Sequence, residues 1–116
     1  MKTRLFLTAA ALMLTAPAIA EFTLVTEGAE TVLADVRLPR NDHGTIAYKP
    51  CEGCDFVTRR VAPDARWEIN GKAVTLPQFR KRTEKLADRD DHTVTVTRHI
   101  ESNRITLVST IIRDSE

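Results

Sequence analysis

Two cysteines separated by two residues are the part of this sequence whose type and spacing could do chemistry. They lie in the stretch from Lys49 to Asp55, and the 116 residues contain no other cysteine. Such a pair can form a disulfide, act as a redox dithiol or hold a metal ion. The segments on either side of the pair must decide among these uses.

The flanking residues favour a structural disulfide between Cys51 and Cys54. The ranges 45–49 and 56–61 both have the composition of strands, so we expect the pair at the tip of a hairpin. Gly53 gives the backbone the freedom to close the small ring. In the chain-entropy model, a loop of about four residues stabilises the fold by about 2 kcal/mol.

Two alternatives stay open for the cysteine pair. A thioredoxin-like site needs a stabilised thiolate, whereas Glu52 and Asp55 add negative charge and the residues that follow are strand-like. A zinc or copper site would need further ligands, and His43, which precedes Cys51 by eight residues, is the candidate to join Cys51 and Cys54. The disulfide interpretation implies no cofactor.

The first 20 residues have the pattern of a secretory signal peptide. Lys2 and Arg4 precede an apolar run of about 10 residues, and Ala18 and Ala20 are small residues before the expected cleavage site. A bilayer span needs about 20 apolar residues, and no later run is long enough. We expect cleavage after Ala20, a periplasmic or secreted protein, and no membrane span in the mature chain. The alternative is a retained N-terminal anchor.

Residues 21–116 have the length of a single small domain. Loss of Lys2 and Arg4 reduces the 17 basic residues to 15, against 16 acidic ones. A nearly neutral chain has no overall attraction to nucleic acid or anionic lipid. No aromatic residues interleave with the basic ones to stack bases, so we expect no nucleic-acid partner.

Alternation of apolar and polar residues predicts seven or eight short strands. We expect strands at 22–26, 31–38, 45–49, 56–61, 66–69, 72–74, 93–100 and 105–112, and turns at 27–30, 39–44, 62–65 and 101–104. The strongest hairpin signal is Asn70-Gly71, because both positions tolerate a positive φ. The last strand is apolar on both faces, which places it centrally.

One helix is predicted near residues 76–87. Thr75 and Gln78 have the spacing of a capping box, and Leu76, Phe79 and Leu86 form an apolar stripe. Strands this short leave open edges unless the sheet closes. We therefore predict a mainly β domain, a small antiparallel barrel or curled sheet, with the helix over one opening.

The run from Val61 to Leu76 is similar to a segment of small exported bacterial β-barrel domains of the oligonucleotide/oligosaccharide-binding type. Those domains carry an Asn-Gly-Lys-like turn, as at Asn70-Gly71-Lys72, then a valine and a short helical stretch before two closing strands. The resemblance covers about residues 61–112. It implies a barrel fold and no particular activity, and the cysteine pair and the charged helix are not part of its pattern.

Basic residues could form one anion-binding face if the helix packs near the second hairpin. The candidates are Arg59, Arg60, Arg80, Lys81 and Arg82. Guanidinium groups suit carboxylate and phosphate, although a solvated helix face balanced by aspartates would have the same composition. The sequence contains no recognisable nucleophile setting, phosphate loop or carboxylate pair.

We therefore expect an exported small binding or structural domain rather than an enzyme. Its partner would be another cell-envelope protein, a glycan or a small anion. The alternative is a periplasmic thiol-redox or metal-handling protein that uses the Cys-x-x-Cys pair.

Overall fold

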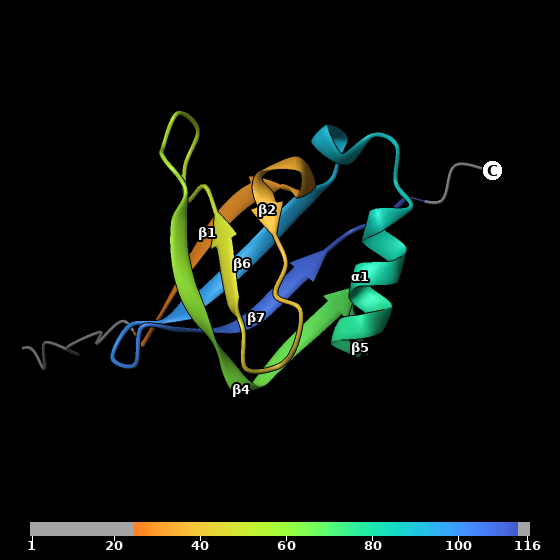
Figure 1. Cartoon of the computed structure of the whole chain (residues 1–116). Helices are drawn as coiled ribbons and strands as arrows, with labels where there is room; N and C mark the ends of the chain where they lie inside the picture. The colour runs from red at the N-terminus through yellow and green to blue at the C-terminus, as the bar shows by residue number, and fades with distance from the viewer. Residues whose placement is uncertain (1–24, 114–116) are drawn as a thin grey trace, which may run out of the picture.

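The computed structural model describes residues 25–113, and the structural statements that follow concern this part of the chain. The predicted signal peptide and the residues flanking this range lie outside it. Strands dominate the described part, with one α-helix and two short 3-10 helices (Figure 1). The elements in chain order are β1 (Thr26–Val32), η1 (Leu33–Asp35), β2 (Val36–Arg37), β3 (Thr45–Tyr48), β4 (Val57–Ile69), β5 (Lys72–Val74), α1 (Leu76–Glu84), η2 (Arg89–Asp91), β6 (Thr93–His99) and β7 (Arg104–Thr110).

The strands form a single sheet in the order β1-β6-β7-β4-β3-β2, with β5 paired to β4. All pairs are antiparallel except β4 and β7, which run parallel. The chain between these two strands contains β5, α1 and β6, which is long enough for the crossover that a parallel pair requires. β7 lies between β6 and β4, as the apolar character of both its faces predicts.

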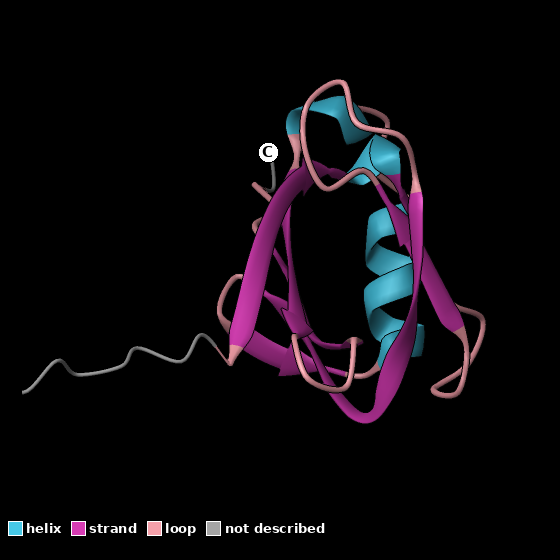
Figure 2. Cartoon of the chain, turned by 90° about the vertical axis from the view of Figure 1, so that its left-hand side faces the viewer, coloured by secondary structure: helices cyan, strands magenta, loops and turns pink. Residues whose placement is uncertain are grey.

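The sheet is strongly curled because the first part of the chain belongs to both of its edges. β1 pairs with β6 at one edge, and after η1 the chain continues as β2, which pairs with β3 at the other edge. In Figure 2 the viewer looks into the opening of the curled sheet, and α1 is seen behind that opening. The helix therefore covers one end of the curled sheet, as predicted. The mainly β, curled-sheet fold class expected from the sequence is confirmed.

The core fills the concave side of the sheet. Its buried members come from β2, β3, β4, β6, β7 and α1, with one more from η1 and one from the segment after β7. They are Leu33, Val36, Ile46, Tyr48, Val61, Trp67, Ile69, Leu76, Phe79, Val94, Val96, Ile105, Val108 and Ile112. Phe79 of α1 is fully buried, and its ring lies 5.3 Å from that of Trp67 on β4. This contact attaches the helix to the sheet.

α1 begins at the predicted capping box. The Thr75 hydroxyl accepts from the Gln78 N–H at 3.3 Å, and the Gln78 side chain accepts from the Thr75 N–H at 3.0 Å. The helix ends at Glu84, before the expected 87. No helix in residues 25–113 has the length and apolar character needed to cross a bilayer.

The Asn70-Gly71 turn is confirmed between β4 and β5. The φ angles are 54° at Asn70 and 79° at Gly71, both in the left-handed region. The Asn70 side chain also donates to the Ile112 carbonyl at 3.0 Å and accepts from the Ile112 N–H at 2.8 Å. The turn therefore joins the hairpin to the segment that follows β7.

Two predicted turns are strand in the structure. Residues 27–30 belong to β1, where each pairs with a residue of β6. Residues 62–65 lie inside β4, at the point where its register with β7 shifts. Pro63 is tolerated there because these positions have no ladder partner on either side, so its missing N–H costs no hydrogen bond.

The strand expected over 31–38 is also wrong in its middle. Leu33 to Asp35 form η1, and the Leu33 N–H donates to the His92 carbonyl at 2.9 Å. The bend places Leu33 in the core and exposes Ala34, which reverses the alternation read from the sequence. The expectation that all strands are short is also wrong, because β4 has 13 residues.

Candidate functional site

The cysteine pair lies in the loop between β3 and β4, where the sequence predicts it. Cys51 and Cys54 are paired as a disulfide with 5.2 Å between their Cα atoms, so neither thiol is free. The Cys54 N–H donates to the Cys51 carbonyl at 3.1 Å, and Gly53 has a φ of 79° that a side chain would strain. The loop leads into β4 and not into a helix.

His43 does not lie beside the cysteines. It precedes β3 and Cys51 follows that strand, so the length of β3 separates the two residues. Within residues 25–113, no three histidine, cysteine, aspartate or glutamate side chains are grouped so as to hold a metal ion. The three residues of the metal alternative are therefore not brought together.

The structure divides the predicted basic residues among three places. Arg59 and Arg60 are neighbours on β4, so they point to opposite faces of the sheet. Arg59 shares the inner face with Val57 and Val61 and is half-buried, whereas Arg60 is exposed on the outer face. The other three candidates lie on α1.

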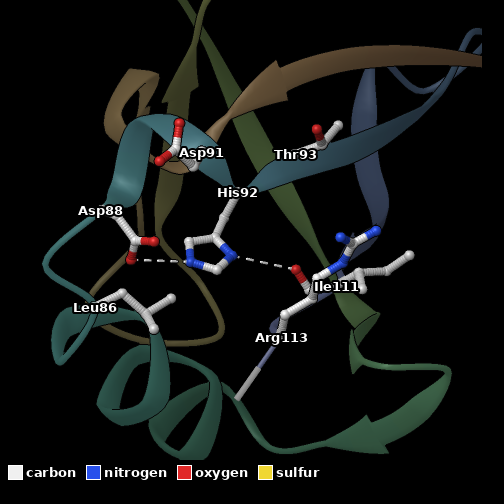
Figure 3. A pocket seen from close by; sticks show the side chains of 7 residues that line it. All are labelled: Leu86, Asp88, Asp91, His92, Thr93, Ile111 and Arg113. Atoms are coloured by element: carbon white, nitrogen blue, oxygen red, sulfur yellow. Dashed lines mark hydrogen bonds and ion pairs between the residues drawn. The ribbon is translucent and has the colours of Figure 1, made fainter. Parts of the chain in front are cut away.

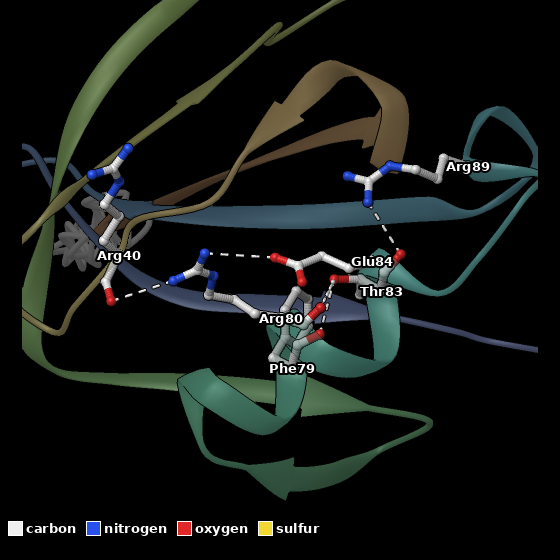
Figure 4. Close-up of polar contacts among 6 residues, drawn as sticks. All are labelled: Arg40, Phe79, Arg80, Thr83, Glu84 and Arg89. Atoms are coloured by element: carbon white, nitrogen blue, oxygen red, sulfur yellow. Dashed lines mark hydrogen bonds and ion pairs between the residues drawn. The ribbon is translucent and has the colours of Figure 1, made fainter.

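These candidates follow one another along α1, and Figure 4 shows the contacts of Arg80. Arg80 donates to the Arg40 carbonyl at 3.4 Å and contacts the Glu84 carboxylate at 3.5 Å. Lys81 and Arg82 are exposed on the helix. An arginine whose charge is met by a carboxylate on the same helix, beside exposed cations, is typical of a solvated helix face.

Arg89 has a structural role next to this face. Its guanidinium donates to the carbonyl of Thr83 at 3.1 Å and to that of Leu33 at 3.2 Å (Figure 4). The Thr83 carbonyl is one of the last in α1, and it also accepts from the Leu86 N–H at 3.4 Å. Arg89 thus ties the end of α1 to η1.

A cationic and aromatic surface lies on the outside of the sheet, beside the disulfide loop. We call it the outer basic surface, and it consists of Arg37, Lys49, Phe56, Arg60 and Arg104. The Arg37 guanidinium carbon lies 4.7 Å from the centre of the Phe56 ring, and the Lys49 ammonium lies 5.1 Å from it. Phe56 is 39% exposed, although it is a large apolar residue.

Arg60 and Arg104 extend this surface along the sheet. Phe56, Thr58 and Arg60 occupy alternate positions and share the outer face of β4. Arg60 is in register with Arg104 of β7, and neither arginine forms an ion pair within residues 25–113. Adjacent like charges on paired strands destabilise a sheet, and a bound anion would remove that repulsion.

The sequence pointed to only one member of this surface, Arg60. Arg37, Lys49, Phe56 and Arg104 are far apart in the chain, and they meet only through the pairing of β2 with β3 and of β4 with β7. Strand register was the missing information. The Lys49-x₆-Phe56 spacing around the cysteine loop was the one available signal, since a hairpin places its two ends side by side.

A small polar cavity lies on the inner face, on the other side of β4. It has a volume of about 170 Å³ and is lined by residues of four strands and one loop: Glu27, Ala29, Tyr48, Pro50, Val57, Arg59 and Arg98. Burial raises the pKa of Tyr48, and the nearby charges of Arg59 and Arg98 partly oppose this shift. Arg98 is held by the Glu27 carboxylate and by the Asn103 side chain at 2.9 Å.

A depression near η2 has a volume of about 730 Å³ (Figure 3). His92 is buried at its base, with Nε2 at 3.2 Å from the Asp88 carboxylate and Nδ1 at 3.4 Å from the Ile111 carbonyl. Both ring nitrogens therefore face oxygen acceptors, and neither is open to a ligand. His92 joins η2 to the segment after β7.

No family model matches this chain, and neither the curated proteins nor the solved structures contain a significant match.

Proposed function

We propose that this chain is an exported binding domain that takes an acidic glycan on its outer basic surface. The observation that carries the proposal is the Arg60–Arg104 couple beside the exposed Phe56, since neither arginine has an ion pair in the part of the chain that the structure describes. Arginine forks suit carboxylate and sulfate groups. An outer sheet face with several cations along it suits a polymer that repeats such a group along its length.

The strand arrangement supports a domain of the oligonucleotide/oligosaccharide-binding type. Such a domain is a partly open five-stranded barrel that binds ligands on the face of its second and third strands. In this chain β1 and β2 together correspond to the first strand of such a barrel. β3 corresponds to its second strand, β4 to its third, β6 to its fourth and β7 to its fifth. Phe56 and Arg60 then lie on or beside the expected ligand face.

Export is the second part of the proposal. The signal-like residues 1–20 suggest it, and a disulfide between Cys51 and Cys54 is the usual state of two close cysteines in an oxidising compartment. The thiol-redox or metal-handling alternative has no specific observation in its favour. It would need the pair to open and further ligands or a stabilised thiolate to be supplied.

The test is calorimetric titration of the mature protein with an oligogalacturonate, in which every sugar carries a carboxylate. We expect saturable binding that weakens with salt, and a loss of about tenfold in affinity in the R60Q/R104Q double variant. The matched control is K81Q/K85Q, which removes the same charge from α1 and should bind as the wild type does.

Two results would contradict this function. One is the absence of saturable binding at low salt, and the other is an equal loss of affinity in K81Q/K85Q. An oligoglutamate peptide is the comparison ligand. If it binds more tightly than the glycan, the partner is an acidic polypeptide instead.

A further inference from the structure

The inner cavity next to Tyr48 contains hydrogen-bond donors without acceptors. Tyr48 is only 3% exposed and forms no hydrogen bond with residues 25–113. The Nε atom of Arg59 is buried and also has no partner there. A buried donor left unpaired costs about 1–3 kcal/mol, so the Arg59 Nε–H at this cavity calls for an acceptor, and the Tyr48 hydroxyl beside it can donate to the same group.

The size of the cavity limits what that acceptor can be. Its volume of about 170 Å³ corresponds to roughly six waters at the ~30 Å³ each occupies in the liquid. A carboxylate on a short carbon chain fits this space, whereas a nucleotide or an oligosaccharide does not. The apolar part of the lining, Ala29 and Val57, suits the carbon end of such a group.

The charges around the cavity call for a single negative charge. Arg98 is neutralised by Glu27, and its guanidinium is further held by Asn103. Among residues 25–113, the side chain of Arg59 forms a hydrogen bond with the Thr58 carbonyl alone, at 3.3 Å, and no ion pair. One cation is therefore left without a counter-charge, beside a tyrosine whose hydroxyl can donate.

We propose that this cavity is a binding site for one carboxylate group, held by Arg59 and the Tyr48 hydroxyl. The site is separate from the outer basic surface, because Arg59 and Arg60 lie on opposite faces of β4. A small free carboxylate or the carboxyl terminus of a peptide would supply the same group. The proposal goes beyond the glycan-binding function and does not depend on it.

The direct probe is sodium acetate, added while the Nε–H resonance of Arg59 and the ring resonances of Tyr48 are followed by NMR. We expect saturable shifts of both signals. R59Q should weaken acetate binding by about tenfold or more, since it removes a charge-assisted hydrogen bond. R60Q is the matched control, because it removes the same charge from the other face of the same strand.

The two variants also separate this site from the outer surface. R59Q should lose acetate binding and keep oligogalacturonate binding, and R60Q should show the reverse. Y48F tests the hydroxyl without a change of charge, and we expect acetate binding to weaken by a few fold. If R59Q does not fold, Y48F decides the question, and an unchanged affinity overturns the proposal.

Two further ligands identify the source of the carboxylate. A short peptide with a free C-terminus and the same peptide amidated are compared with acetate. A site for chain termini binds only the free peptide, and more tightly than acetate; a site for small carboxylates favours acetate. The proposal is overturned if acetate causes no saturable shift, or if R60Q weakens acetate binding as much as R59Q does.

Discussion

Tyr48 is the only tyrosine of the chain, and it lies where the hydrophobic core meets the inner cavity. Burial disfavours its charged form, whereas Arg59 and Arg98 favour that form. Burial is the larger effect, so the pKa of Tyr48 is raised above its ordinary value of 10.0. A single residue therefore reports on both packing and charge.

The raised pKa of Tyr48 predicts how stability responds to alkaline pH. Above about pH 10, the unfolded chain loses the phenolic proton while the folded chain keeps it. The folded state then binds more protons, so the free energy of unfolding falls as the pH rises from the unfolded pKa toward the folded one. Urea unfolding at several pH values should show this fall, and Y48F should not.

Substitution of Arg59 should move the same titration. R59Q removes a positive charge that favours the phenolate, so the pKa of Tyr48 should rise further. Phenolate absorbance measures this directly because no other tyrosine is present. R60Q should leave the titration unchanged, and an equal shift in both variants would show that the two arginines are not on opposite faces.

His92 acts as a structural connection in this structure. H92A removes a ring that is 7% exposed and its contacts with Asp88 and Ile111. We expect the free energy of unfolding to fall by about 2 kcal/mol, mostly from lost packing, since Asp88 is itself well exposed. H99A, on the exposed β6–β7 hairpin, is the control. Equal effects of the two changes would refute this role.

At the scale of elements, local signals were sufficient where a few adjacent residues determine the backbone. The Thr75 and Gln78 capping box and the Asn70-Gly71 turn depend on side chains within three positions of each other. The disulfide loop likewise follows from the spacing of Cys51 and Cys54 and from the glycine between them. These elements were predicted correctly for the physical reason given.

Elements that depend on distant pairing were not predictable. Residues 27–30 contain a glycine and two glutamates, and they are strand only because β6 supplies a partner for each of them. The parallel pairing of β4 with β7, which places Arg60 beside Arg104, leaves no periodic signal in the sequence. The outer basic surface was therefore recognisable only in part, through Arg60.

The β3–β4 loop gives a prediction for the cysteine pair. The C51S/C54S double variant should stay folded and lose about 2 kcal/mol of stability, since only a short loop is released. Its affinity for oligogalacturonate should be unchanged, because the disulfide positions no ligand-binding atom. Denaturant unfolding and calorimetry measure the two quantities, and a folded variant that has lost binding would instead give the pair a functional role.

At the scale of the whole molecule, a small, nearly neutral domain carries two separate cationic sites. The curled sheet makes this possible because alternate residues of β4 face its inside and its outside. Arg59 thus lines the small inner cavity, whereas Arg60 faces solvent on the outer surface. The total charge gives no indication of either site, since the chain has nearly as many acidic residues as basic ones.

The most direct test of the account is an NMR map of the mature protein with and without oligogalacturonate. The account predicts that the largest shifts occur at Phe56, Arg60 and Arg104, on the outer face of the sheet. It would be contradicted if saturating glycan left these residues unchanged, or if the shifts were concentrated on α1.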